Sequence, residues 1–228
     1  MRIGAVVHAR MSSRRLPGKV LRDLAGRPLL AHLFARLLRA EGLDAIVLAT
    51  SIAPDDDAVA AFATGHGLPC HRGPLDDVAA RLLGAAEAHK LDAIVRINGD
   101  SPLMDPAIVS EAVRLFRGDA LDLVTNVFPR SFPKGQSVEV VATAALARVV
   151  RDAVPDDREH VTQHIYRHPE TFRIRNFAAT TPRPELQLSV DTEDDFRRIA
   201  RIVERAGARA ETIALAEIVT LAEAAYAP

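Results

Sequence analysis

Short apolar runs alternate with segments of helical periodicity along the first half of the chain. The runs are rich in β-branched residues and bounded by loop residues, which is typical of strands buried on both faces of a parallel sheet; they cover residues 3–9, 44–50 and 92–100. Between and after these runs, apolar residues recur at helical spacing behind acidic first turns. These segments predict helices over residues 28–42, 55–67, 76–90 and 105–118.

This alternation of strand and helix implies a parallel sheet with right-handed crossovers and helices on both faces. The second half of the chain has a different pattern, in which strands are predicted over residues 122–128, 136–143, 172–179 and 186–192. The remaining periodic segments predict helices over residues 143–153, 157–168, 193–207 and 215–227. No repeat, low-complexity segment or linker separates the two halves. We therefore expect a single domain, residues 1–228, with a small mixed β insertion at about 122–180.

The composition is that of a globular protein, with 48% hydrophobic and 26% charged residues in a chain of 228. A net charge of -1 argues against a nucleic-acid partner, since such proteins usually carry a basic face. The single cysteine, Cys70, excludes an intramolecular disulfide and an all-cysteine zinc site. No apolar run approaches the roughly 20 residues of a membrane helix, and no signal-peptide pattern precedes the first strand. We therefore expect a cytoplasmic protein without a membrane partner.

The residues that follow the first predicted strand form a basic loop, ARMSSRRLPGKVL, at positions 9–21. It carries Arg10, Arg14, Arg15 and Lys19 and no acidic residue. In an open α/β sheet, ligands bind outside the carboxyl ends of the strands, which is where this loop must lie. Arginine forks and a lysine suit phosphate oxygens, so this position favours a phosphate site over a solvated basic surface.

Neither of the common phosphate-binding motifs explains the basic loop. The Walker sequence GxxxxGK[ST] and the dinucleotide fingerprint GxGxxG are both absent from the chain. Ser12 and Ser13 add hydroxyl donors, while Pro17 and Gly18 fix the turn that precedes Lys19. The loop therefore predicts a phosphate site of a different kind.

The same loop resembles the N-terminal signature of the CMP-sugar-acid synthetases, A-R-x-x-S-x-R-L-P-G-K. The matching positions are Ala9, Arg10, Ser13, Arg15, Leu16, Pro17, Gly18 and Lys19. This family includes the acylneuraminate and 3-deoxy-manno-octulosonate cytidylyltransferases, and its spore-coat polysaccharide cytidylyltransferase-like branch is the most similar to this chain. The resemblance implies a three-layer α/β/α Rossmann-like fold of the nucleotide-diphospho-sugar transferase type, with a mostly parallel central sheet.

By this resemblance, the protein is a CTP-dependent cytidylyltransferase. It would transfer CMP from CTP to a sugar acid or related acceptor and release pyrophosphate, in surface polysaccharide or glycoconjugate biosynthesis. Arg15 and Lys19 would act in catalysis by stabilising the departing pyrophosphate. The resemblance also implies a homodimer. The expected nucleotide site comprises Ala9, Arg10, Ser13, Arg15, Lys19, Arg72 and Asn98.

Two acidic positions are candidates for binding Mg²⁺, which prefers oxygen ligands and keeps several waters. Asp100 follows Asn98 and Gly99 at the end of a predicted strand, and the segment resembles the family's G-D-x-P element, which implies a catalytic, metal-binding aspartate. Asp191 lies just before a predicted helix, where its pattern fits an N-cap as well as a metal ligand. Its resemblance to the family's V-D-T-x-x-D-L element favours the ligand, whereas Asp105 is assigned to capping.

The acceptor side of the site is expected to involve polar residues from the middle of the chain: Arg81, Asn126, Arg130, Glu139, Glu159 and His160. Arg81 can also be interpreted as a surface residue of a helix. Strand alternation offers a solvent-facing edge as the other interpretation of Glu139. Glu159 and His160 lie in an R-E-H-V-T segment that resembles the spore-coat branch.

A stripe of histidines, His160, His164 and His168, recurs at helical spacing in the predicted helix 157–168. Such a pair can bind zinc, but neither an H-E-x-x-H motif nor a cysteine cluster accompanies it. We therefore favour an exposed helix face or an oligomer contact.

Other functions compatible with the predicted fold stay open. The protein could transfer a different nucleotide or use another acceptor. It could be a glycosyltransferase that uses a nucleotide sugar, although that class usually has a D-x-D motif, and GDSP at residues 99–102 offers a single aspartate. It could also be a non-catalytic nucleotide-binding module. The presence of Arg15, Lys19, Asp100 and Asp191 together argues against such a decayed site.

Overall fold

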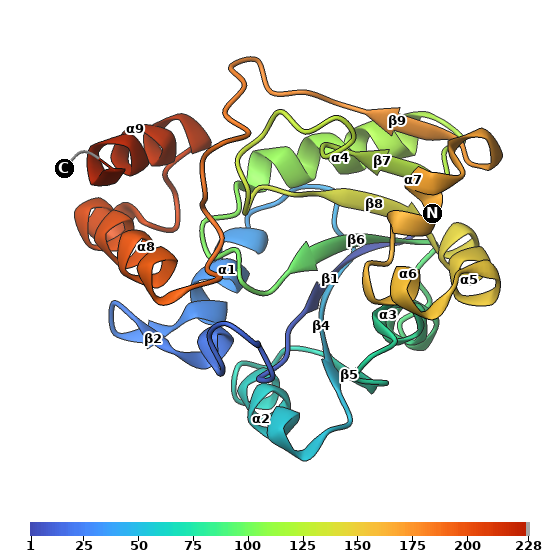
Figure 1. The fold of residues 1–228 in the computed structure, drawn as a ribbon, viewed down its shortest axis with the longest axis horizontal. Helices are drawn as coiled ribbons and strands as arrows, with labels where there is room; N and C mark the ends of the chain where they lie inside the picture. The colour runs from blue at the N-terminus through green and yellow to red at the C-terminus, as the bar shows by residue number, and fades with distance from the viewer. Residues whose placement is uncertain (227–228) are drawn as a thin grey trace.

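A computed structural model describes residues 1–226 of the chain. Within them, seven strands form a central sheet (Figure 1). These strands are β1 (Ile3–His8), β4 (Ala45–Ser51), β5 (Cys70–Gly73), β6 (Ala93–Asn98), β7 (Leu123–Thr125), β8 (Glu139–Ala142) and β9 (Ile174–Asn176). Their order in the sheet is β5-β4-β1-β6-β8-β7-β9. A separate hairpin pairs β2 (Asp23–Leu24) with β3 (Arg27–Pro28).

Among the described strands of the central sheet, β8 alone runs in the opposite direction. It pairs antiparallel with β6 and β7, whereas the other pairs are parallel. The amino end of β8 therefore lies at the edge where β6 and β7 end. His8 pairs in register with Asn98, and Arg96 pairs with Glu139, so polar residues of three strands meet near that edge.

Helices cover both faces of the sheet (Figure 1). Ile3, Ala5 and Val7 of β1 share an apolar cluster with one set of helices, and Val6 shares a second cluster with the other set. The first set is α1 (Leu29–Leu37), α2 (Asp57–Gly65) and α4 (Pro106–Gly118). The second set includes α3 (Val78–Ala88) and α5 (Thr143–Asp152). The predicted three-layer α/β/α fold with a mostly parallel sheet is confirmed.

A third apolar cluster joins the C-terminal helices, α8 (Glu193–Ala206) and α9 (Leu215–Tyr226), to the side of this core. Phe196 of α8 belongs to this cluster together with Leu188 and Val190, which lie in the extended segment before α8. The Val190 carbonyl oxygen accepts a hydrogen bond from Lys19 at 2.6 Å. The cluster therefore holds this segment next to the loop that follows β1.

The strand predicted over residues 186–192 is wrong. Among the described residues, this segment forms an isolated bridge between Gln187 and Lys134 rather than a strand of a sheet. Its apolar residues Leu188 and Val190 pack against α8, so their alternation reflects burial by a helix rather than pairing with a strand.

The helix predicted over residues 157–168 is wrong as a single element. The structure has two short helices, α6 (Pro155–Glu159) and α7 (Gln163–Arg167), separated at Val161, whose φ of 51° is left-handed and interrupts a helix. His160 therefore does not share a helical stripe with His164 and His168. Within residues 1–226, no group of three or more His, Cys, Asp or Glu side chains is arranged to hold a metal ion. The zinc interpretation of the stripe thus has no geometric support.

None of the helices within residues 1–226 has the length and hydropathy needed to cross a membrane. The predicted C-terminal helix is present as α9, while position 227 of that prediction lies outside the described residues.

Candidate functional site

A cleft of about 480 Å³ opens at the ends of β1 and β6, beside the basic loop. Ala9, Ser13, Asn98 and His160 line it. Among the described residues, its wall also carries six cationic side chains and three carboxylates: Arg10, Arg14, Arg15, Lys19, Arg81 and Arg96 against Asp100, Glu159 and Asp191. This excess of positive charge suits a polyanionic ligand. Residues predicted from distant parts of the sequence thus meet in one cleft.

Lys19 is the centre of the charged network in the cleft. Its Nζ donates to Asp100 Oδ2 at 2.7 Å, to the Val190 carbonyl oxygen at 2.6 Å and to Asp191 Oδ1 at 3.2 Å. Gly18, at φ 72°, makes the turn that starts the short 3-10 helix η1 (Lys19–Leu21). A glycine suits this turn because the left-handed conformation is strained for other residues. The turn directs Lys19 inward, where only 8% of it is exposed.

The basic loop closes on itself at Met11. The Met11 carbonyl oxygen accepts hydrogen bonds from the amides of Ser13 and Gly18, both at 2.9 Å, which joins the beginning of the loop to its end. Arg15 projects from the closed loop, and its Nη2 lies 2.9 Å from Asp191 Oδ1. The loop is therefore a compact unit that presents its cations to the carboxylates of the cleft.

His8 lies in the cleft at the end of β1. Its Nε2 is 2.7 Å from Oδ1 of Asn98, its register partner on β6. Burial, and then the positive charges of Arg96 and Arg81, hold the pKa of the imidazole well below its ordinary value. The ring is therefore neutral near pH 7, and its Nε2–H donates to the Asn98 amide oxygen.

An ion pair crosses the cleft between the basic loop and the end of α6. Arg10 Nη2 lies 3.2 Å from Glu159 Oε1, and His160 follows directly in the chain. Arg81 reaches the same cleft from α3, where burial lowers the pKa of its guanidinium. Three of the residues predicted for the acceptor side, Arg81, Glu159 and His160, thus share the cleft with the loop.

Asp191 does not cap α8, although its sequence pattern permits that role. Thr192 is the N-cap: its Oγ1 accepts from the Asp195 amide at 3.2 Å, and the Asp195 carboxylate accepts from the Thr192 amide at 2.9 Å. This capping box leaves the Asp191 carboxylate to the cleft. Asp105 does cap its helix, as predicted, by accepting from the Ala107 amide at 2.9 Å.

The donor set of Asp100 and Asp191 fits a hard divalent cation. The two carboxylates converge on the same Lys19 nitrogen, so they already share one positively charged neighbour. Their side chains are 22% and 26% exposed, which leaves room for water. Two carboxylates, completed by water and phosphate oxygens, are the usual surroundings of Mg²⁺ in proteins.

Arg72 is not brought to the cleft, although the sequence assigned it to the nucleotide site. Its Nε donates to the Ser51 carbonyl oxygen at 2.9 Å, and its Nη2 donates to the Ala53 carbonyl oxygen at 3.1 Å. Its Nη1 lies 2.7 Å from Asp57 Oδ1. Arg72 therefore supports the turn after β4.

Asn126 and Arg130, predicted for the acceptor side, also lie outside the cleft. Asn126 is fully buried; its amide donates to the Gln136 carbonyl oxygen at 2.7 Å and accepts from the Val138 amide at 2.9 Å. Both of its polar atoms serve the backbone, so direct contact with a ligand is corrected to a structural role. Arg130 donates to Ser137 Oγ at 3.0 Å and is partly buried.

Glu139 is neither on a solvent-facing edge nor in the wall of the cleft. It begins β8, an interior strand, and only 3% of it is exposed. Its carboxylate accepts hydrogen bonds from Arg96 Nη1 and from the Tyr166 hydroxyl. Glu139 therefore lies behind Arg96, which faces the cleft.

The sequence analysis did not identify His8 and Arg96 as residues of the site. Arg96 interrupts an apolar strand, and both residues are on the side of their strands that carries Val6 and Ile94 toward α3. A polar residue near the carboxyl end of a strand that is otherwise buried on both faces is the signal that could have found them.

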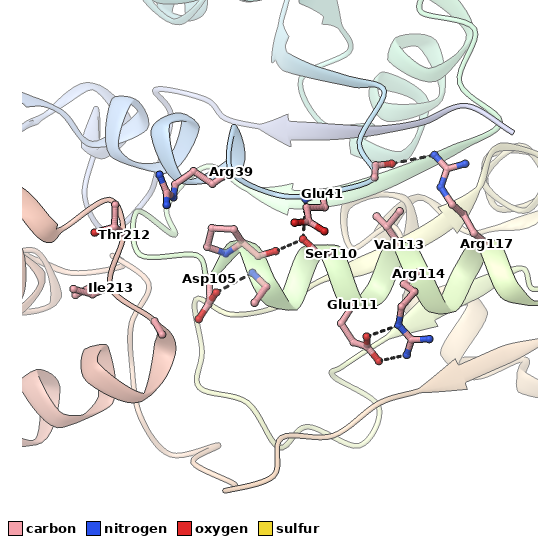
Figure 2. Close-up of a pocket in the computed structure, with 14 residues that line it drawn as sticks. Arg39, Glu41, Asp105, Ser110, Glu111, Val113, Arg114, Arg117, Thr212 and Ile213 are labelled. Carbon is pink, nitrogen blue, oxygen red and sulfur yellow. Dashed lines mark hydrogen bonds and ion pairs between the residues drawn. The ribbon is translucent and has the colours of Figure 1, made fainter.

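A larger hollow of about 720 Å³ lies between α4 and residues 212–214 (Figure 2). Its charges balance, because Arg39, Arg114 and Arg117 stand against Glu41, Asp105 and Glu111. Arg114 pairs with Glu111 at 2.6 Å, as Figure 2 shows, and Arg117 donates to the Gly42 carbonyl oxygen at 3.0 Å. This hollow shows no preference for a charged ligand, so the smaller cleft is the better candidate.

Known proteins similar to this chain agree with that choice. The family model described as cytidylyltransferase matches residues 5–225. The spore coat polysaccharide biosynthesis protein SpsF of Bacillus subtilis (strain 168) is 31% identical over 226 residues, which cover 95% of this chain and 92% of that protein. A 3-deoxy-manno-octulosonate cytidylyltransferase of Anaeromyxobacter sp. (strain Fw109-5) is 36% identical over 147 residues, which cover 61% of this chain and 58% of that protein.

The fold is similar over the same length. A solved structure of a cytidylyltransferase from Leptospira borgpetersenii serovar Hardjo-bovis (strain JB197) has a TM-score of 0.93 and 26% identity, covering 98% of this chain and 94% of that one. The family match, the full-length relative and the shared fold all agree with the resemblance of the basic loop. The chain therefore belongs to the cytidylyltransferase family.

Proposed function

We propose that this protein transfers CMP from CTP to a hydroxyl group of a sugar acid or related acceptor, with release of pyrophosphate and with Mg²⁺ as its metal. The observation that carries the proposal is the network around Lys19, where loop cations meet two carboxylates in one cleft. Membership of the cytidylyltransferase family supports CTP as the donor. The relative named as a 3-deoxy-manno-octulosonate cytidylyltransferase supports a sugar acid as the acceptor.

The basic loop would hold the phosphate groups of CTP. Arg10 and Arg15 offer guanidinium forks for pairs of oxygens, and Lys19 offers a point charge. Ala9 and Ser13 line the same side of the cleft. Phosphate binding by Arg10 and Arg15 exchanges their present partners, Glu159 and Asp191, for phosphate oxygens.

Asp100 and Asp191 would hold the metal ion, which supplies charge neutralisation on the oxygens of the transferred group. Lys19 donates to both carboxylates and so fixes their orientation. Asn98, two residues before Asp100, is held by His8. These contacts preorganise the end of β6 for the chemistry.

The reaction would be an in-line displacement at the α-phosphorus of CTP. The acceptor oxygen forms a bond to this phosphorus, the bond from phosphorus to the pyrophosphate oxygen breaks, and the acceptor hydroxyl loses its proton. Arg15 and Lys19 stabilise the negative charge on the departing pyrophosphate. Positioning and electrostatic stabilisation supply most of the rate gain in such a transfer.

The acceptor would lie beside Arg81, Glu159 and His160. Arg81 and Arg96 each keep a buried Nε that has no hydrogen-bond partner among the described residues, so donors are available on this side. The name of the Bacillus subtilis relative supports a role in surface polysaccharide or glycoconjugate biosynthesis. The proposal includes one nucleotidyltransferase domain over residues 1–228, acting as a homodimer.

Pyrophosphate release tests this function. The assay compares CTP, ATP, GTP and UTP, each with Mg²⁺ and a panel of sugar acids, and repeats the active combination with excess chelator. We expect release to require CTP, an acceptor and the metal. It should be lost in Asp100→Ala and retained in Asp119→Ala, which removes an exposed aspartate paired with Arg175.

Each other outcome has a distinct meaning. Release with a different nucleotide would correct the donor, and consumption of a nucleotide sugar would favour a glycosyltransferase. Release that persists in Asp100→Ala would remove that carboxylate from the mechanism. No release from any nucleotide, together with no CTP binding by calorimetry, would rule the proposal out.

A further inference from the structure

Asp56 occupies a position from which an aspartate ordinarily caps a helix. It ends the 3-10 helix η2 (Pro54–Asp56) and is the N-cap residue of α2. Within the described residues, however, its side chain accepts no hydrogen bond from the first turn of α2. Only 1% of Asp56 is exposed, so the buried carboxylate needs another explanation.

The carboxylate of Asp56 is bonded to the basic loop instead. Oδ1 accepts a hydrogen bond from the Met11 amide at 2.6 Å. Oδ2 accepts from the Ser51 amide at 3.3 Å and from the Ser51 hydroxyl. Ser51 is the last residue of β4, so Asp56 joins the end of this strand to the loop that follows β1.

Met11 is the residue on which that loop closes, since its carbonyl oxygen accepts from the amides of Ser13 and Gly18. The Met11 amide also shares a rigid peptide plane with the Arg10 carbonyl group. A contact that fixes Met11 therefore fixes both the exit of the chain from β1 and the junction of the two loop ends. Asp56 provides that contact.

We propose that Asp56 is a positioning residue for the phosphate-binding loop, and that it determines where Arg10, Arg15 and Lys19 meet the phosphate groups. This inference rests on the proposed function, because that function assigns the phosphates of CTP to the loop. Asp56 is not among the described residues that line the cleft, so it acts through Met11 rather than on the ligand.

The chemistry of the three hydrogen bonds suggests how to separate them. A buried carboxylate is tolerated when donors satisfy its oxygens, and here Met11 and Ser51 supply them. Alanine at position 56 would leave the Met11 amide without its acceptor. Asparagine keeps one acceptor oxygen for Met11, while its nitrogen donates to the Ser51 hydroxyl.

The first test measures CTP binding by calorimetry in Asp56→Ala and Asp56→Asn. The matched control is Asp55→Ala, which removes an exposed aspartate from the neighbouring position. We expect Asp56→Ala to weaken CTP binding by about tenfold or more, and Asp56→Asn to restore it to within about threefold of wild type. Asp55→Ala should bind like wild type. Unchanged binding in Asp56→Ala, or equal weakening in Asp55→Ala, would overturn the proposal.

Amide hydrogen exchange tests the same role in the full chain without a ligand. Asp56→Ala should speed exchange at the amides of Met11, Ser13 and Gly18, while the amides of β1 and β6 keep their protection. If the wild-type protein fails to bind CTP, the proposed function fails, and exchange alone decides the role of Asp56. Faster exchange throughout the sheet in Asp56→Asn as well as Asp56→Ala would show a general structural role and refute positioning.

Discussion

Glu139 shows how a buried charge is accommodated next to the cleft. Its carboxylate accepts from Arg96 and from the Tyr166 hydroxyl, and Tyr166 is bonded in turn to Thr125 Oγ1 at 2.8 Å. Burial, together with the Glu139 charge, raises the pKa of Tyr166, so its hydroxyl keeps the proton that it donates. The row ties β6, β8 and β7 together and holds Arg96 at the cleft.

We expect Glu139→Ala to lower the free energy of unfolding by about 3–5 kcal/mol, because it leaves the buried charge of Arg96 without its carboxylate. Urea unfolding measures this change. Glu111→Ala is the control, since it removes the solvent-exposed partner of Arg114 and should leave the urea midpoint at its wild-type value. A loss in Glu139→Ala no larger than in Glu111→Ala would show that the row does not stabilise the fold.

At the scale of elements, a turn at Gly135 brings two distant segments into close backbone contact. Gly135 has a φ of 90°, and a Cβ added there would lie 2.5 Å from the Leu188 carbonyl carbon and the Ser189 nitrogen. Backbone hydrogen bonds next to the glycine hold residues 186–188 against the turn. Because this segment leads into Asp191, the turn also determines where that carboxylate enters the cleft.

Gly135→Ala should therefore destabilise the protein more than a matched substitution at Gly26. Gly26 has a nearly identical φ of 89°, but nothing lies within 4 Å of an added Cβ. Both variants carry the left-handed cost of about 1–2 kcal/mol, and Gly135→Ala adds a backbone clash. We expect a larger fall in Tm for Gly135→Ala, with weaker pyrophosphate release. Equal effects of the two substitutions would contradict the close contact.

The capping box at the start of α8 has a second structural effect, since it leaves Asp191 to the cleft. Thr192→Ala removes the hydroxyl that accepts from the Asp195 amide. We expect a loss of about 1 kcal/mol and a fall in Tm of roughly 2–4 °C, measured by thermal unfolding. Thr220→Ala is the control, because Thr220 is exposed within α9. A Tm in Thr192→Ala equal to that of Thr220→Ala would mean that the box contributes no stability.

The strands that the sequence predicted best are those buried on both faces. Residues 3–9, 44–50 and 92–100 contain β1, β4 and β6, because burial on two faces requires an unbroken apolar run. β5 was not predicted, since Cys-His-Arg-Gly has no apolar pattern and the strand pairs with one neighbour at the edge of the sheet. Residues 186–192 have a strand-like pattern because α8 buries them.

The same limits apply to the residues of the site. Lys19 and Asp100 could be placed together because both follow strands whose carboxyl ends share an edge of the sheet. Asn126 also follows a strand, but its amide bonds the backbone, which no local pattern reveals. Asp56 has the sequence context of a helix cap, so its hydrogen bond to Met11 becomes visible only in the folded chain.

At the scale of the whole molecule, two histidines make stability depend on pH. Burial lowers the pKa of His32, whose Nε2 lies 2.6 Å from the Leu24 carbonyl oxygen. Burial and the charge of Arg96 lower the pKa of His8. The unfolded chain therefore binds protons at these positions at a higher pH than the folded chain does. Stability is complete above the ordinary histidine pKa of about 6.5 and is lost as the pH falls below it.

We expect the free energy of unfolding in urea to decline from about pH 6.5 toward pH 5, by at most about 1.4 kcal/mol per pH unit for each histidine. His32→Gln keeps a hydrogen-bond donor but does not titrate, so its curve should be flatter over this range. A wild-type curve that rises toward acid pH, or an equally steep curve in His32→Gln, would contradict this assignment.

The pairing of cations with carboxylates inside the cleft bears on which anions the protein selects. The pairs are Arg10–Glu159, Arg15–Asp191 and Lys19–Asp100, so the wall carries its own counter-ions. Sulfate or inorganic phosphate gains a guanidinium only by depriving a carboxylate of its counter-ion. A ligand that brings anionic oxygens and a divalent cation together satisfies both members of each pair. The cleft is thereby insulated against simple inorganic anions and selects mixed charge before it recognises any base or sugar.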